Sequence, residues 1–242
     1  MSHHPFARPS PITLSPATPG ERKIRGEALI AEGRPLEAIP HLESAWKGNP
    51  GDHLLLLRVA AIQSWFHRDA ELAATCRLAR GFARGTRDAG IADAVAKSSS
   101  LRPPDDPTDR TATLALARSA NELGKHYDNA GWFRMGRGIA EYRAGHDEAA
   151  AETLRATIED GQPQISITSA FYLAMTLPRQ RKGEETRQVL AEAISRMRPY
   201  PGDEANPLAG GDNHDDLILW MACKEATAVL KFHSDAASPS DR

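Results

Sequence analysis

The sequence predicts an all-α fold, an α-α superhelix (solenoid) of about five helix pairs that ends in a C-terminal capping helix. Three observations support this prediction. From Glu21 onward, alanine and leucine recur at three- and four-residue spacing, as on the buried face of a helix. Convincing alternation with a period of two residues, which would indicate strands, is absent from the sequence. Short breaks that combine Gly or Pro with polar residues divide the pattern into segments of similar length.

The chain divides into three parts by composition. Residues 1–20 carry five prolines with Ser and Thr between them, which predicts a flexible leader because such a segment neither forms a helix nor buries much surface. The leader is either a linker to an upstream domain or simply an irregular N-terminal segment. Residues 21–235 are expected to form the helical repeat domain, and residues 236–242 a disordered tail.

Within the repeat domain, each helix is expected between two breaks. About eleven helices are predicted, near 21–32, 35–48, 52–66, 69–84, 87–99, 108–123, 129–143, 147–159, 164–178, 184–198 and 213–232. Helices of similar length joined by short loops pack as antiparallel neighbours, so consecutive helices should form pairs. Pro40 is the exception to a regular pattern, because a proline inside a helix should bend it or delay its start. The longest irregular segment is expected at about 199–212.

Small residues recur at fixed distances along these pairs. In the first pair, Gly26 and Ala38 would let two antiparallel helices come close, with Leu42 and Ala45 filling the space around them, and Pro50 ends the second helix. The spacing returns twice, at Gly138, Ala150 and Leu154 and at Ala174, Leu177, Thr186, Leu190 and Ala193. The match is weaker in 53–86, where Leu72 stands at a position that is usually small, and 87–123 has two helices without the spacing.

These positions resemble the tetratricopeptide repeat, a unit of about 34 residues that consists of two antiparallel helices. Segments 130–154, 169–193 and 206–226 also resemble the C-terminal tetratricopeptide region of planctomycete-type bacterial serine/threonine protein kinases, in which a kinase domain precedes the repeats. This chain lacks the Gly-rich loop and DFG, and its His67-Arg68-Asp69 is not followed by the Lys and Asn of a catalytic loop. The resemblance therefore implies the repeat domain alone, free-standing or as a fragment.

The ionisable residues form no catalytic or metal-binding pattern. Nine histidines are scattered, and Cys76 and Cys223 lie in apolar helical patterns without a neighbouring His, which favours core packing. The cluster at 212–216 fits the capped start of the last helix better than a cation site. We therefore predict no enzyme, no cofactor and no metal. The alternative is a small-ligand sensor or enzyme in a helical-repeat frame, which would need convergent ionisable groups in one deep pocket.

The charge and hydropathy of the chain narrow the choice of partner. A net charge of −2 gives no basic field for nucleic acid, and no stretch approaches the ~18 apolar residues of a membrane span. The N-terminus lacks the apolar run of a signal peptide, which predicts a cytoplasmic protein. The predicted function is a scaffold that binds a protein or peptide partner on the concave face of the superhelix.

In such stacks the first helix of each pair lines the concave face. Aromatic and arginine side chains are the usual anchors of protein interfaces. The candidate partner-binding residues on that face are Trp65, Met135, Tyr142, Arg143, Phe171 and Arg179. For Trp65 and Phe171 the alternative is packing between the repeats. The sequence does not predict the oligomeric state.

Overall fold

The computed structural model describes residues 17–103, 106–159 and 162–236, and the side chains of these residues up to 231. All regular structure in this part of the chain is helical, which confirms the predicted all-α class. Residues 1–16 of the expected leader and 237–242 of the expected tail lie outside the described residues. The helices are α1 (Pro19–Ala31), α2 (Pro35–Gly48), α3 (His53–Trp65), α4 (Asp69–Phe82), α5 (Ala89–Ser100), α6 (Pro107–Gly124), α7 (Ala130–Arg143), α8 (Asp147–Glu159), α9 (Pro163–Thr176), the short 3-10 helix η1 (Leu177–Gln180), α10 (Gly183–Arg196) and α11 (His214–Ala236).

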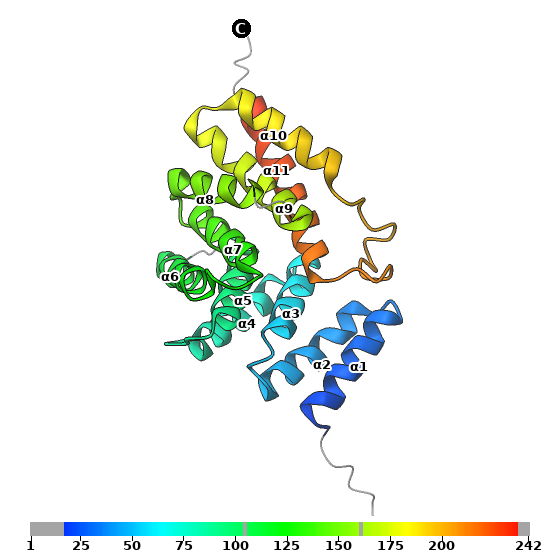
Figure 1. The fold of residues 1–242 in the computed structure, drawn as a ribbon. Helices are drawn as coiled ribbons and strands as arrows, with labels where there is room; N and C mark the ends of the chain where they lie inside the picture. The colour runs from blue at the N-terminus through cyan, green and yellow to red at the C-terminus, as the bar shows by residue number, and fades with distance from the viewer. Residues whose placement is uncertain (1–16, 104–105, 160–161, 237–242) are drawn as a thin grey trace, which may run out of the picture.

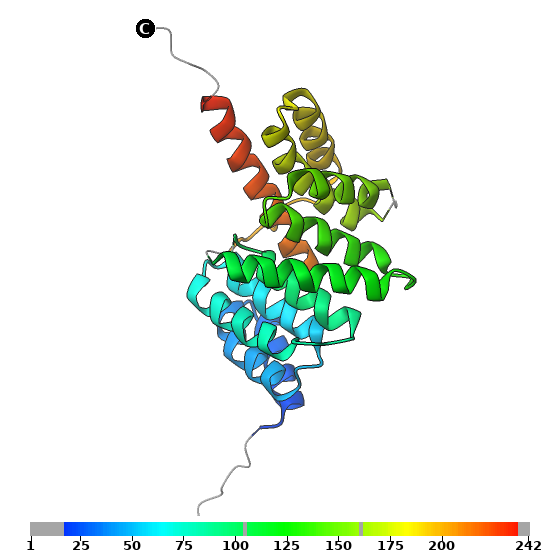
Figure 2. The ribbon, with the colours of Figure 1, turned by 90° about the vertical axis from the view of Figure 1, so that its left-hand side faces the viewer.

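The helices form a stack of five antiparallel pairs, α1/α2 to α9/α10. The first helices α3, α5, α7 and α9 pack against one another in succession. Each of the second helices α2, α4, α6 and α8 packs between its own partner and the first helix of the next pair. Figure 2 shows successive pairs following one another along the length of the molecule. This is the α-α superhelix that the sequence predicts.

Local sequence signals account for where helices begin. Thr18 and Glu21 form a capping box, in which the Thr18 hydroxyl accepts from the backbone N–H of Glu21 and the Glu21 carboxylate accepts from the N–H of Thr18. α1 therefore begins at Pro19, inside the segment expected to be leader. α2 is continuous from Pro35 to Gly48, so Pro40 does not delay its start. Pro40 is exposed, and water can replace the hydrogen bond that its missing N–H would have made.

The small residues lie at the closest contacts within pairs, as their spacing predicts. A Cβ atom on Gly26 would overlap the Leu42 side chain, and a Cβ on Gly138 would lie 2.7 Å from Cδ2 of Leu154. Real Cβ contacts are longer than this, so each glycine allows α1 to approach α2, or α7 to approach α8. Ala38 is fully buried beside the first of these contacts.

The second pair is looser than the others. Its helix α4 packs less extensively on α3 and on α5 than the other second helices do on their neighbours. Leu72 is buried on α4 at the position where the first, fourth and fifth pairs have Ala38, Ala150 and Thr186. The larger side chain explains why α4 stands away from the stack, because the helix backbones cannot close over it.

The last helix does not cover the end of the stack. It returns along the inner side of the superhelix, where it packs against α3 and α9. Four consecutive residues at its start, 217–220, are all buried, which requires neighbours on more than one side of the helix. The irregular segment 197–213 carries the chain from the end of α10 to this position. The expected capping helix exists, but its place in the fold differs from the prediction.

Candidate functional site

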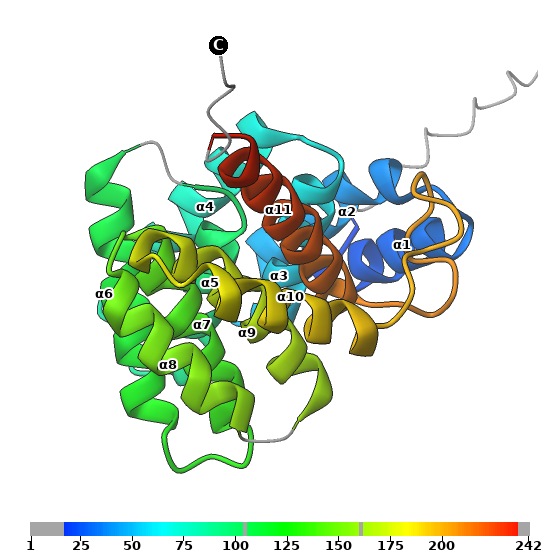
Figure 3. The same cartoon turned by 90° about the horizontal axis from the view of Figure 1, so that it is seen from above.

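The inner face of the stack, which the sequence predicts as the binding face, is occupied by α11. Figure 3 shows α11 crossing the molecule over α3 and beside α10. Its buried side chains are Leu217, Ile218, Leu219, Trp220, Ala222, Cys223 and Ala226. They contribute to two hydrophobic clusters, one around α2 and α3 and one around α7 and α9. The free chain therefore has a helix in the groove where a partner was expected.

Arg143 is the polar centre of this contact. Its guanidinium pairs with both carboxylate oxygens of Glu225 on α11, and its Nε donates to the carbonyl of Ser100 at 2.8 Å. The rings of Tyr142 and Tyr172 lie 5.2 and 5.5 Å from the guanidinium carbon. Burial raises the pKa of Tyr172 to about 12. One buried cation thus joins α5, α7, α9 and α11.

Trp65 anchors the other half of α11. Its ring centroid lies 6.0 Å from that of Trp220, and Nζ of Lys224 lies 4.3 Å above it. The indole N–H donates to the carbonyl of Glu204 at 3.0 Å, in the segment before α11. Trp65 therefore holds both the last helix and the segment that leads to it.

Five of the six candidate partner-binding residues are buried, namely Trp65, Met135, Tyr142, Arg143 and Phe171. α11 and the adjacent repeats cover these five side chains, and the burial of Trp65 and Phe171 agrees with the alternative that they pack between the repeats. Arg179 is exposed, lies 5.0 Å over the Tyr142 ring and pairs with Asp147 at 3.1 Å. The structure thus brings Tyr142, Arg143 and Arg179 together, and Met135 and Phe171 pack in the same hydrophobic cluster. Whether these residues bind a partner stays a prediction.

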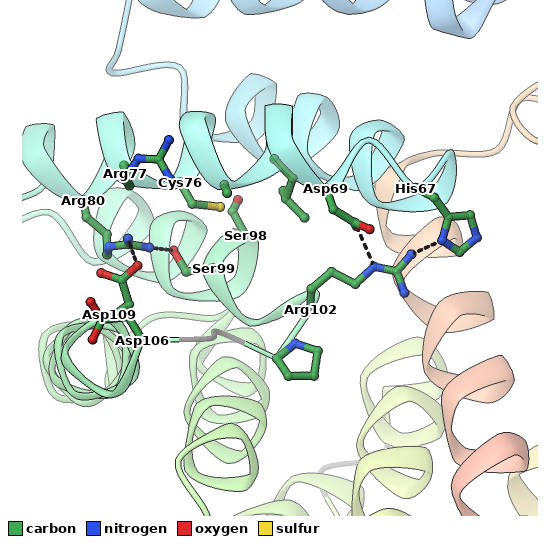
Figure 4. Close-up of a pocket in the computed structure, with 13 residues that line it drawn as sticks. His67, Asp69, Cys76, Arg77, Arg80, Ser98, Ser99, Arg102, Asp106 and Asp109 are labelled. Atoms are coloured by element: carbon green, nitrogen blue, oxygen red, sulfur yellow. Dashed lines mark hydrogen bonds and ion pairs between the residues drawn. The ribbon is translucent and has the colours of Figure 1, made fainter.

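A cavity of about 660 Å³ lies between α4, the end of α5 and the start of α6, where α4 stands away from the stack (Figure 4). Its floor comprises Leu72, Ala73 and Cys76 of α4 with Ser98 and Ser99 of α5. This volume is within the range of about 300–1,000 Å³ that small-molecule sites occupy. Sequence reasoning did not identify this cavity, although Leu72 at the small-residue position was its signal.

Ion pairs close both ends of the cavity (Figure 4). At one end Arg80 pairs with Asp109 and donates to the Ser99 hydroxyl at 3.3 Å. At the other end Arg102 pairs with Asp69 at 3.5 Å and contacts a ring nitrogen of His67 at 3.0 Å. Each end is therefore neutralised within the protein itself.

Cys76 is the thiol on the cavity floor, and it is not activated. Burial raises the pKa of the Cys76 thiol to about 11, although the nearby Ser99 hydroxyl and Arg80 act in the opposite direction. Both cysteines are free and buried. The described residues contain no group of three or more His, Cys, Asp or Glu side chains that could hold a metal ion. The cavity can therefore bind a small molecule through its apolar floor, serines and paired charges, but its thiol is not prepared to react.

The acidic cluster at the start of α11, residues 212–216, has the structural role that its sequence favours. Asn213 accepts from the backbone N–H of Asp215 at 2.7 Å, and Asp216 accepts from the N–H of Asn213 at 2.9 Å. These hydrogen bonds cap the start of α11. Arg198 pairs with Asp212 at 2.7 Å and with Asp216 at 3.1 Å, so the acidic side chains are also partnered.

Comparison with known proteins supports the fold. No protein-family model and no curated protein matches the sequence. Among solved structures, a thermophilic TPR protein of Thermus thermophilus is similar, with a TM-score of 0.54 and 18% identity over 87% of this chain and 100% of that one. In the described part of the chain, no helix combines the length and hydropathy needed to cross a membrane. The chain therefore has a tetratricopeptide-like helical repeat fold.

Proposed function

We propose that this protein is an interaction scaffold that binds a protein or peptide partner on the concave side of its superhelix, and that it has no catalytic activity. The observation that carries the proposal is the contact between the stack and α11. The inner face holds α11 through aromatic anchors and a buried Arg–Glu pair, which are features of helix-binding grooves between proteins. In the free chain the exposed side of α11 becomes part of the concave surface.

The resemblance to the repeat region of bacterial serine/threonine kinases fits the scaffold proposal. The C-terminal repeat region of planctomycete-type bacterial kinases implies a domain that supplies interfaces and no catalysis, and we propose that this chain has such a role in the cytoplasm. A partner in a kinase-linked complex is compatible with it. His67 lies in the turn between α3 and α4 and has a positive φ of 54°.

The test is capture of a partner by the full-length chain. A tagged chain is cross-linked in extract of the source cells, and captured proteins are quantified by mass spectrometry. We expect one protein in near-equimolar amount, and weaker capture by Arg179→Ala, because Arg179 is the accessible candidate residue. The matched control is Arg187→Ala, at an exposed Arg–Glu pair on α10. Equal capture by both variants and the natural chain would remove Arg179 from the binding surface.

The cavity under α4 supports a second candidate function, a small-ligand sensor. Its convergent ionisable groups are the feature that this alternative requires. A library of small organic ions would be screened for compounds that raise the melting temperature. Ala73→Trp, at an exposed position on the cavity floor, should fill the space and abolish such a shift. A ligand-induced shift in the natural chain, together with no captured protein, would favour the sensor over the scaffold.

A further inference from the structure

The outer side of α10 has no covering helix among the described residues. Each of α2, α4, α6 and α8 is covered by the first helix of the following pair. The chain continues from α10 to α11, but α11 packs against α3 and α9 instead. Only Thr186 and Ala193 of α10 are buried, whereas even α1, at the other end of the stack, buries Gly26, Leu29 and Ile30. The side of α10 that a following pair would cover is therefore open, and Ile194 is exposed near its end.

This uncovered side forms an apolar groove of about 470 Å³ with the distal part of α11. The end of α10 and the segment after it supply Ile194, Met197 and Tyr200. One face of α11 supplies Cys223, Lys224, Thr227, Ala228 and Lys231. Ile194 and Tyr200 are 45% and 40% exposed, so two large apolar residues that border the same groove are open to solvent.

The two lysines give the groove a positive wall. They lie two helical turns apart on α11. Lys224 pairs with Glu204 at 2.7 Å and is held against the rings of Trp65 and Tyr200. Lys231 is exposed, and the described side chains supply no ion-pair partner for it. A ligand that enters the groove therefore meets an apolar floor beside the exposed ammonium group of Lys231.

We propose that the groove between α10 and α11 binds an amphipathic helix of a partner protein, one whose apolar stripe is flanked by acidic side chains. A helix is the expected occupant, because a helix covers the equivalent side of every other second helix in the stack. Acidic flanks complement the exposed Lys231, whereas Lys224 is already paired with Glu204. This inference rests on the proposed scaffold function and names the surface and the partner chemistry.

Binding of a designed probe to the full-length chain tests the chemistry of the groove. The probe is a labelled helical peptide of about 18 residues, roughly five turns, with leucines on one face and glutamates beside them. A matched peptide has lysine in place of glutamate. We expect fluorescence anisotropy to show binding of the acidic peptide, about tenfold weaker binding to Ile194→Glu, and a similar loss with Lys231→Glu. Ile24→Glu, at a 70% exposed position on α1, is the control that should bind normally.

Several outcomes would overturn the proposal. These are equal binding of both peptides, equal losses in Ile194→Glu and Ile24→Glu, or a dimer of the natural chain that Ile194→Glu dissociates. Binding to phosphatidylglycerol vesicles that Ile194→Glu abolishes, without peptide binding, would also overturn it, because the groove would then be a lipid site.

A second experiment separates this proposal from the scaffold function. A photo-cross-linking residue is placed at Ala228 in the groove, and in a second variant at Leu78, which is exposed on α4. Cross-linking of a partner at Ala228 alone supports the groove. Cross-linking at Leu78 but not at Ala228 overturns the groove and leaves the scaffold intact, whereas capture at neither position, with none by the natural chain, overturns both.

Discussion

Arg143 on α7 and Glu225 on α11 form a two-pronged ion pair in which the arginine side chain is only 4% exposed. The same guanidinium donates to the backbone carbonyl of Ser100 at the end of α5. This ion pair makes α11 an integral part of the folded stack. Without α11, the buried guanidinium of Arg143 would lack its carboxylate partner, and an unpaired buried charge is costly in free energy. The concave side of this superhelix is therefore closed at its centre.

Glu225→Gln should destabilise the protein, because it removes the negative partner of a buried cation. Loss of one partner of a buried pair costs about 3–5 kcal/mol, and partial exposure of Glu225 should reduce this to about 2–3 kcal/mol. Urea unfolding measures the change. The control is Glu192→Gln, which breaks an exposed pair with Arg196 and should cost less than about 1 kcal/mol. Equal effects of the two changes would show that the Arg143–Glu225 pair does not hold α11.

Two glycines should respond in opposite directions to alanine. Gly26→Ala would place a Cβ against Leu42 at the α1–α2 contact, and overpacking of this kind costs about 1–3 kcal/mol. Gly81→Ala, in α4 with nothing near its Cβ position, should stabilise the helix by about 0.5–1 kcal/mol. Melting temperatures of the two variants test this prediction. Destabilisation by both changes would show that steric overlap with Leu42 is not the cause of the loss at Gly26.

The helices could be predicted because their signals are local. Apolar spacing and Gly- or Pro-containing breaks locate the starts of the described α-helices to within about two residues, and the end of α11 to within about four. Even the earlier start of α1 has a local signal, since Thr18 and Glu21 have the spacing of a capping box. The close contacts at Gly26 and Gly138 follow from the same repeat spacing.

The binding surface could not be predicted in the same way. The repeat spacing places Trp65, Tyr142 and Arg143 on first helices, but it does not say where a helix much further along the chain, at 214–236, will lie. That depends on long-range packing and on the irregular segment 197–213. The cavity under α4 could be predicted only in part. Leu72 indicates that the second pair is loosely packed, but it does not indicate the ion pairs that close the two ends of the cavity.

The Cys76 thiol should be nearly inert to alkylation in the folded protein. Its pKa is raised from about 9 to about 11, so near pH 8 its thiolate fraction is roughly 100-fold smaller than that of an ordinary thiol. In a Cys223→Ser background, iodoacetamide labelling should be slow in buffer and fast in urea. Since the unfolded thiol ionises first, stability should also fall as pH rises from about 9 to 11. Fast labelling in buffer would contradict this environment for Cys76.

His214, at the start of α11, should make the fold less stable in mild acid. Burial lowers its pKa below the ordinary value near 6.5, with Lys97 of α5 and Arg58 of α3 acting in the same direction and Asp215 and Asp216 opposing them. The unfolded chain therefore takes up the proton first, so stability is full above about pH 6.5 and falls as pH decreases toward the folded pKa. His214→Gln should flatten this fall in urea titrations between about pH 7.5 and 5.5. His126→Gln, at an exposed position, should leave the slope unchanged, and an equal change in both variants would show that the pH dependence does not arise at the start of α11.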